Sequence, residues 1–158
     1  MVDINEILLL NDDQVDYVAL LNETLGALAL AEDMFIATSA LAELARRKSP
    51  LAASVARTIL DESRGDSFLK SSALETLFAV DRKQALPYIA AHALSADSPL
   101  VDTIRELMVE NSEIFREIFH VTDTASTTRT VAQRVDTLDA QGTELDPALQ
   151  RDFQKLFQ

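Results

Sequence analysis

The amino-acid sequence predicts an all-α fold. Ala and Leu, two strong helix formers, supply 45 of the 158 residues, whereas Gly occurs only three times. The alternation of β-branched and polar residues that marks a half-buried strand is missing. Short turns separate the apolar segments, so neighbouring helices should pair as antiparallel hairpins.

Signals that start and stop helices place the individual elements. Ser49-Pro50, Ser98-Pro99 and Asp146-Pro147 each put a capping side chain before a proline at the first helical position. Gly65 can end one helix in the left-handed conformation, and Asp66 can cap the next. The expected helices span residues 3–10, 13–30, 34–47, 50–63, 67–80, 83–95, 99–110, 112–119, 126–140 and 147–157.

Two segments need separate comment. In the helix expected over 13–30, an apolar stripe at helical spacing predicts the face that meets the core, made of Val15, Val18, Leu21, Leu25 and Leu28. The run 122–130 is rich in Ser and Thr and is expected to be a linker.

An internal repeat is visible in the middle of the chain. Residues 35–44 align with 68–77 at a constant offset of 33, and Phe, Ser, Ala, Leu and Leu are identical at five positions. Val55 and Leu60 match Ile89 and Leu94 at offset 34, so the match spans a complete helical hairpin. A weaker third copy begins near 97–100, which is typical of a terminal repeat.

The repeated unit resembles the HEAT-like α-helical repeats: it has an Asp or Ser turn, a first helix that carries Ala-Leu-x-x-Leu, and a second helix that begins near a Pro. The Trp, Tyr and Gly positions of the tetratricopeptide pattern are not met. The resemblance implies one domain over 1–158, with hairpins over 33–119 stacked as a short α-solenoid and capping helices over 120–158. A plain helical bundle is the alternative.

Several chemistries find no support in the sequence. There is no Cys, and three isolated Gly cannot form a phosphate-binding loop or a nucleophile elbow. His92 and His120 lie 28 residues apart and form no helix-borne zinc pair. Asp102, Glu106, Glu110 and Glu113 form an acidic stripe with Arg105 interleaved, which we interpret as a solvated helix face. We therefore expect no catalytic residue, cofactor or metal.

Charge is the most informative property of the chain. The formal net charge is −12, which disfavours nucleic acid and anionic membrane surfaces as partners and favours a basic protein. Nine acids and no base occur in the first 45 residues, before the basic turn Arg46-Arg47-Lys48. Acids in a first helical turn also complement the helix dipole. The partner-binding candidates from this region are Asp12, Asp13, Asp16, Glu23, Glu32 and Asp33.

Tyr88 and His92 are two further candidates. They lie four residues apart and therefore on one helix face, in the second helix of the second repeat. In stacks of this kind the second helices usually line the concave surface, where the pair would contact a partner. The alternative is a half-buried Tyr and His at the edge of the core.

These observations predict a non-enzymatic protein-binding module. In size, charge and fold class the chain resembles bacterial immunity proteins, which neutralise a cognate and often basic toxin domain. The alternatives are an adaptor, a chaperone or a self-associating scaffold whose basic turn meets another subunit's acidic face, and a HEAT-like chromophore lyase subunit. The acidic start of the chain is unlike a signal peptide, and no uncharged stretch reaches the length of a spanning helix, so we expect a cytoplasmic protein.

Overall fold

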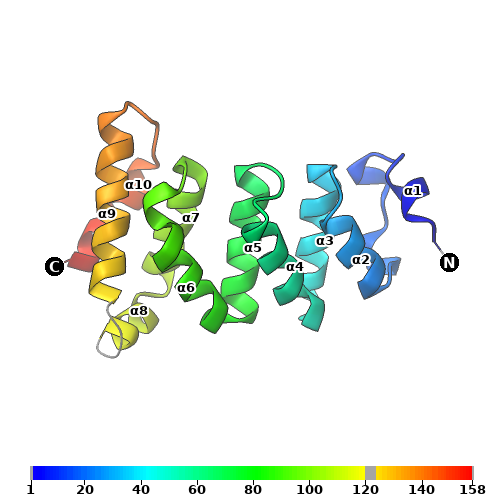
Figure 1. Cartoon of the computed structure of the whole chain (residues 1–158), viewed down its shortest axis with the longest axis horizontal. Helices are drawn as coiled ribbons and strands as arrows, with labels where there is room; N and C mark the ends of the chain where they lie inside the picture. Colours follow the sequence, from blue (N-terminus) through cyan, green and yellow to red (C-terminus); the bar gives the residue numbers. More distant parts are fainter. Residues whose placement is uncertain (1, 120–123, 158) are drawn as a thin grey trace. The chain divides into compact units, whose positions relative to one another are not determined.

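A computed structural model describes residues 2–119 and 124–157, and within these ranges the protein is all-helical, with no strand (Figure 1). The α-helices are α1 (Ile4–Ile7), α2 (Asn22–Ala29), α3 (Met34–Arg46), α4 (Pro50–Asp61), α5 (Ser67–Val80), α6 (Arg82–His92), α7 (Ser98–Glu110), α8 (Ser112–Phe119), α9 (Thr124–Ala140) and α10 (Pro147–Gln154). Four 3₁₀ turns complete the described chain: η1 (Asp12–Gln14), η2 (Tyr17–Ala19), η3 (Ala93–Ser95) and η4 (Lys155–Phe157).

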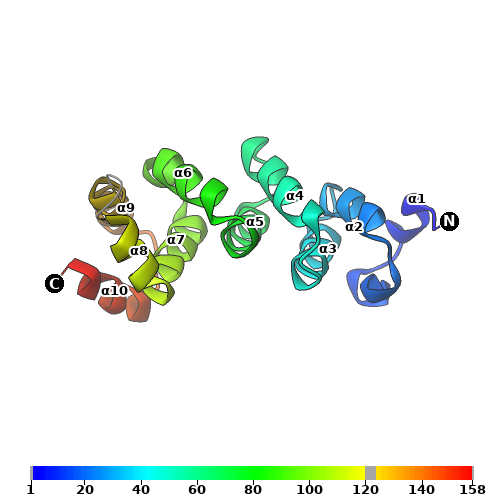
Figure 2. The same ribbon diagram turned by 90° about the horizontal axis from the view of Figure 1, so that it is seen from below.

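The chain divides into two compact units, Met1–Ala85 and Leu86–Gln158, with the boundary inside α6. In the first unit, α4 packs on α5 and α3, and α2 packs on α3 and α4. Figure 2 shows the resulting layers of this unit, with α3 and α5 in one and α2 and α4 in the other. Leu residues from three of these helices, α2, α3 and α5, have no solvent exposure and form its core: Leu25, Leu28, Leu41, Leu44, Leu74 and Leu77.

Most of the predicted helix signals are confirmed. The side chains of Ser49, Asp66 and Asp146 accept hydrogen bonds from backbone N–H groups in the first turns of α4, α5 and α10. Gly65 has a φ of +70°, and a Cβ there would lie 2.6 Å from the Leu69 side chain. The prediction for α7 was wrong by one residue, because Asp97 caps this helix through the backbone N–H of Leu100.

The prediction for the N-terminal segment was wrong. The helix expected over 3–10 is limited to α1, and the helix expected over 13–30 is replaced by η1, η2 and the shorter α2. Only Leu25 and Leu28 of the expected core stripe are fully buried, whereas Val18 and Leu21 are 68% and 71% exposed. Leu20 takes a buried position instead. The physical reason is a contact from α3, described below.

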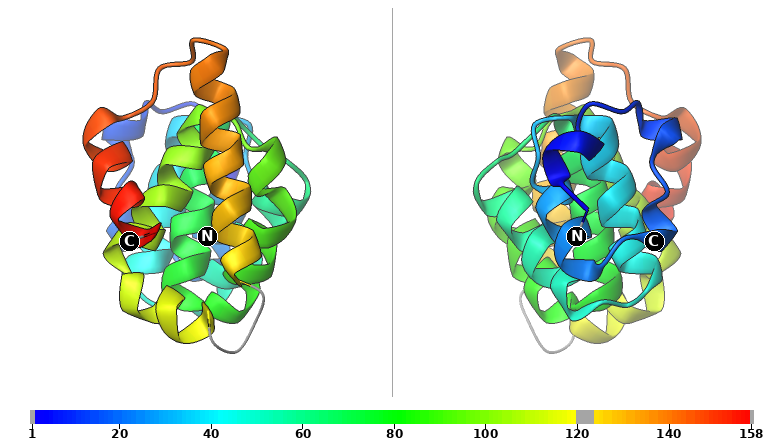
Figure 3. Two further views of the ribbon diagram at one scale, coloured as in Figure 1. Left: turned by 90° about the vertical axis from the view of Figure 1, so that its left-hand side faces the viewer. Right: turned by 90° about the vertical axis from the view of Figure 1, so that its right-hand side faces the viewer.

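In the second unit, α7 packs on α9 and α10, and α9 packs on η3. In the left panel of Figure 3, α9 and α10 of this unit face the viewer. The buried apolar side chains of this unit include Ile104, Met108, Phe115, Val135 and Phe153. The linker expected over 122–130 was wrong from Thr124 onward, where α9 begins, and residues 122 and 123 lie outside the described ranges.

Candidate protein-binding site

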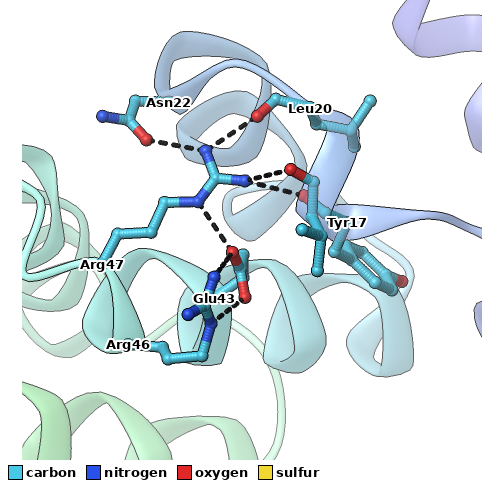
Figure 4. Close-up of polar contacts among 7 residues, drawn as sticks. Tyr17, Leu20, Asn22, Glu43, Arg46 and Arg47 are labelled. Carbon is cyan, nitrogen blue, oxygen red and sulfur yellow. Dashed lines mark hydrogen bonds and ion pairs between the residues drawn. The ribbon is translucent and has the colours of Figure 1, made fainter.

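Arg47, which directly follows α3, binds residues 17–22 of the acidic N-terminal region. Its guanidinium donates hydrogen bonds to the backbone carbonyls of Tyr17 (3.0 Å), Val18 (2.9 Å) and Leu20 (2.8 Å) (Figure 4). It also donates to the side-chain oxygen of Asn22 at 3.0 Å. The planar, forked geometry of guanidinium suits several acceptors at once, which the ammonium of Lys cannot match.

These bonds explain why residues 17–21 do not continue a helix. In an α-helix the carbonyls of Tyr17, Val18 and Leu20 would accept the backbone N–H groups four residues later. Here they accept N–H groups of Arg47, which lies 27 to 30 residues away in the sequence. A cluster of Asn and Asp at positions 11, 12, 13, 16 and 22 was the local signal of this irregular structure, since these residues compete with helical hydrogen bonds.

Glu43 fixes the orientation of Arg47 from inside α3. Its carboxylate accepts from Nε of Arg47 at 2.7 Å and from Nε and Nη2 of Arg46 at 2.7 and 2.6 Å. Hydrogen bonds from Arg46 and then Arg47 hold the pKa of Glu43 at about 2, below its usual value of 4.5. The Glu43 side chain is 8% exposed. The carboxylate therefore stays charged and holds the two arginines in place.

The low pKa of Glu43 gives a testable dependence of stability on pH. The folded-state pKa of Glu43 lies below its unfolded-state pKa. The ionised carboxylate therefore contributes to the free energy of unfolding above about pH 4.5, and this contribution is lost as pH falls toward about 2. In urea unfolding followed by circular dichroism, the wild type should lose stability across this window more steeply than Glu43→Gln. Glu23→Gln is the matched control and should keep the wild-type slope. Equal slopes for wild type and Glu43→Gln would contradict the prediction.

A second contact closes the segment on itself. The Tyr17 hydroxyl donates to Oδ1 of Asp12 at 2.6 Å. Burial raises the pKa of Tyr17 above its usual value, and the hydrogen bond to Asp12 and the charges of Asp12 and Asp33 add to this effect, against a hydrogen bond with Ser39. Asp12, Asp33 and Ser39 are thus brought around one phenol, which joins the segment to α3.

The structure separates the predicted acids into two groups. Asp12 binds Tyr17, and Asp33 caps α3 by accepting from the backbone N–H groups of Phe35 and Ile36, so both have structural roles. The other group is exposed, and its side chains have no hydrogen-bond or ion-pair partner among the described residues: Asp13, Asp16, Glu23 and Glu32. These four carboxylates are the ones that a partner could meet without disturbing the fold.

Two exposed apolar side chains accompany these acids. Val18 lies two residues after Asp16, and Leu21 lies two residues before Glu23. Both are more than two-thirds exposed, as a result of the Arg47 contacts that turn this backbone out of helical conformation. Apolar anchors beside a charged rim are the composition of a protein-binding surface. We call Asp13, Asp16, Val18, Leu21 and Glu23 the acidic docking segment.

The basic turn that follows α3 is largely engaged within its own unit. Arg47 is occupied by the acidic docking segment and its neighbours, and Arg46 pairs with Glu43. Lys48 is exposed and has a φ of +52°. The turn therefore offers Lys48 and the outer part of Arg46, which is 63% exposed, to a partner.

Tyr88 and His92 lie in the second unit, near the end of α6. Their rings stack with centroids 4.2 Å apart and an interplanar angle of 25°. Tyr88 is 5% exposed, so a partner would reach His92 and not the Tyr88 ring. The acidic docking segment belongs to the other unit, so the predicted partner-binding residues come from both units.

The acidic stripe of α7 and α8 is only partly solvated, so the prediction of a solvated face was wrong at its start. Asp102 pairs with Arg105, whose side chain has no solvent exposure. Glu106, Glu110 and Glu113 are exposed, as predicted. Among the described residues no group of three or more His, Asp and Glu side chains could hold a metal ion, and His120 lies outside them.

Comparison with known proteins adds no relative. No protein-family model, no curated protein and no solved structure matches the sequence. No helix in the described part of the chain is long and apolar enough to cross a membrane. The site must therefore be interpreted from its own geometry.

Proposed function

We propose that this protein is a non-enzymatic binding module that docks a basic protein through the acidic docking segment. The supporting observation is the Arg47 network, which holds residues 17–22 in one conformation with Val18 and Leu21 exposed between unpaired acids. A surface ordered before binding loses less conformational entropy on association. The acids would steer the encounter, and the apolar side chains would supply much of the affinity.

Neutralisation of a basic toxin domain is the role that we put first. The repeated hairpins of the sequence and the two-layer packing of the first unit fit a short HEAT-like stack, a scaffold suited to binding macromolecules. An immunity protein against a nuclease must act where the nucleic acid lies, so a cytoplasmic location belongs to this proposal. A binding partner whose activity is unchanged in the complex would favour the adaptor or scaffold alternative instead.

Neutralising the acidic docking segment should slow association. In Asp13→Asn/Asp16→Asn/Glu23→Gln the segment keeps its Arg47 contacts but loses three charges. We expect an association rate roughly 10- to 100-fold lower at about 0.05 M salt, with a smaller difference at about 0.3 M salt. The probe is a basic protein that the purified wild type captures at low salt, and surface plasmon resonance gives the rates.

The matched control neutralises three exposed acids of the second unit, Glu106→Gln/Glu110→Gln/Glu113→Gln. This variant changes the net charge by the same amount, so it should slow association less than the first variant. Equal effects of the two variants would mean that net charge alone matters and would refute a local docking segment. Val18→Asp and Leu21→Asp then test the apolar anchors, since each should raise the dissociation rate.

A further inference from the structure

Phe35 and Phe68 form an unusual pair of exposed aromatic residues. They are 76% and 71% exposed, and each is the second residue of its helix, after the capping residues Asp33 and Asp66. The two helices, α3 and α5, pack on each other and run side by side in the same direction (Figure 1). Both rings therefore lie at the same end of one layer of the first unit.

A shallow groove of about 330 Å³ lies between α3 and α5. Small side chains dominate its lining, which consists of Thr38, Ala42, Ala45, Ser72, Glu75, Thr76 and Ala79. On α3, positions 35, 38, 42 and 45 follow the spacing of one helix face, and on α5 positions 68, 72, 76 and 79 do the same. Each helix thus presents a stripe with a large aromatic residue at its start and small residues over the rest.

Such a stripe is complementary to itself when it is reversed. If two copies meet about a two-fold axis that lies across the helices, the start of each helix faces the end of the same helix in the other copy. Each Phe35 ring would then lie over Ala42 and Ala45 of the second copy, where small side chains leave room for it. Each Phe68 ring would likewise lie over Thr76 and Ala79 of the second copy.

The charges at the two ends of this face fit the same reversal. Glu32, Asp33 and Asp66 are at the end that carries the two Phe rings. Among the exposed bases, Arg46 is the last residue of α3 and Lys48 follows that helix, while Arg82 and Lys83 follow α5. In the reversed arrangement the acidic end of one copy meets the basic end of the other.

We propose that the face formed by α3 and α5 is the contact surface of a homodimer, in which a second copy of this chain packs with its helices reversed. The inference does not depend on the acidic docking segment. Helices of 13 and 14 residues about 9 Å apart give a face of about 20 by 20 Å, smaller than a standard interface of about 800 Å² per partner. The dimer is therefore of the weak, transient class and should form only at high protein concentration.

Sedimentation velocity on the full chain tests the proposal. At about 0.15 M salt, which screens the net charge of each copy, the mass should rise with concentration from 17.4 kDa toward twice that value. Phe35→Asp/Phe68→Asp should remain monomeric, because the exposed rings are replaced by charges while the core is unchanged. Leu94→Asp is the control: it adds one charge at a 54% exposed apolar position of the second unit and should dimerise as the wild type does.

The absence of Cys allows a second, geometric test. Ala42→Cys places one thiol near the middle of the reversed stripe and should form a disulfide-linked dimer on mild oxidation, at least 10-fold faster than Ser54→Cys on α4. A wild type that stays at 17.4 kDa throughout, a Phe35→Asp/Phe68→Asp variant that still dimerises, or equal cross-linking of the two Cys variants would each overturn the proposal. So would a monomer that holds a different protein on this face.

Discussion

Replacing Arg47 with Ala should release residues 17–22 from the end of α3. The change removes every guanidinium bond to Tyr17, Val18, Leu20 and Asn22 and leaves three backbone carbonyls without this partner. We expect the free energy of unfolding to fall by about 2–3 kcal/mol. Hydrogen exchange should show the amides of residues 17–22 losing protection while those of α4 and α5 change less.

Arg46→Ala is a close control, because Arg46 binds the same carboxylate but is 63% exposed. Its loss should lower the free energy of unfolding clearly less than the loss of Arg47 does, because solvent screens an exposed ion pair. Arg47→Lys should lie near Arg47→Ala, since an ammonium cannot reproduce the fork. If Arg46→Ala and Arg47→Ala lower the free energy of unfolding equally, Arg47 acts only through its ion pair with Glu43 and does not shape the acidic docking segment.

The Arg47 variant also connects stability with the proposed function. All carboxylates of the acidic docking segment remain in Arg47→Ala, so the long-range attraction for a basic partner should change little. The ordered presentation of Val18 and Leu21 should be lost, which predicts faster dissociation with a nearly unchanged association rate. Neutralising the acids should instead slow association and change the dissociation rate little. The two sets of variants therefore separate electrostatic steering of the partner from the ordering of Val18 and Leu21.

Replacing Arg105 with Ala should have the largest effect in the second unit. The side chain has no solvent exposure, binds Asp102 from within α7 and Gln150 from α10, and lies with its guanidinium carbon 5.9 Å from the centre of the Phe153 ring. Removing it leaves a cavity, a partly buried carboxylate and an unpaired amide. We expect a loss of about 3–5 kcal/mol in the stability of this unit.

Urea unfolding followed by circular dichroism measures this loss, and hydrogen exchange of α10 locates it. Arg134→Ala is the control within the same unit, because Arg134 donates to the carbonyl of Ala96 at 2.7 Å and should cost only about 1 kcal/mol. If Arg105→Ala left α10 protected, the contact with Gln150 would not be what holds α10 to α7.

Within the first unit, the helices over 34–80 could be predicted from the sequence, whereas the conformation of residues 11–21 could not. Over 34–80 the apolar spacing, the Ser49 and Asp66 caps and Gly65 are all local signals, and the helices that they predict match those of the structure to within about a residue or two. Over 11–21 the apolar spacing was also helical, but the conformation depends on a guanidinium that lies far away in the sequence. No pattern within one helix length contains that contact.

The candidate site shows the same division. Charge counting located nine acids in the first 45 residues, yet it did not separate Asp13, Asp16 and Glu23, which are unpaired, from Asp12 and Asp33, which bind the chain itself. The apolar spacing likewise placed Val18 and Leu21 in the core, whereas both are exposed. A carboxylate has the same formal charge whether it caps a helix or faces solvent, and only its neighbours distinguish the two.

The sequence by itself determined the helical class, most helix boundaries and the acidic N-terminal third, because caps, prolines, glycines and apolar periodicity act over a few residues. The tertiary structure alone decided the path of residues 11–21, the burial of Arg105 and the exposure of Phe35 and Phe68. Each of these depends on which side chains from distant segments meet, since hydrogen bonds and packing across helices can outweigh the small local preferences of a single turn.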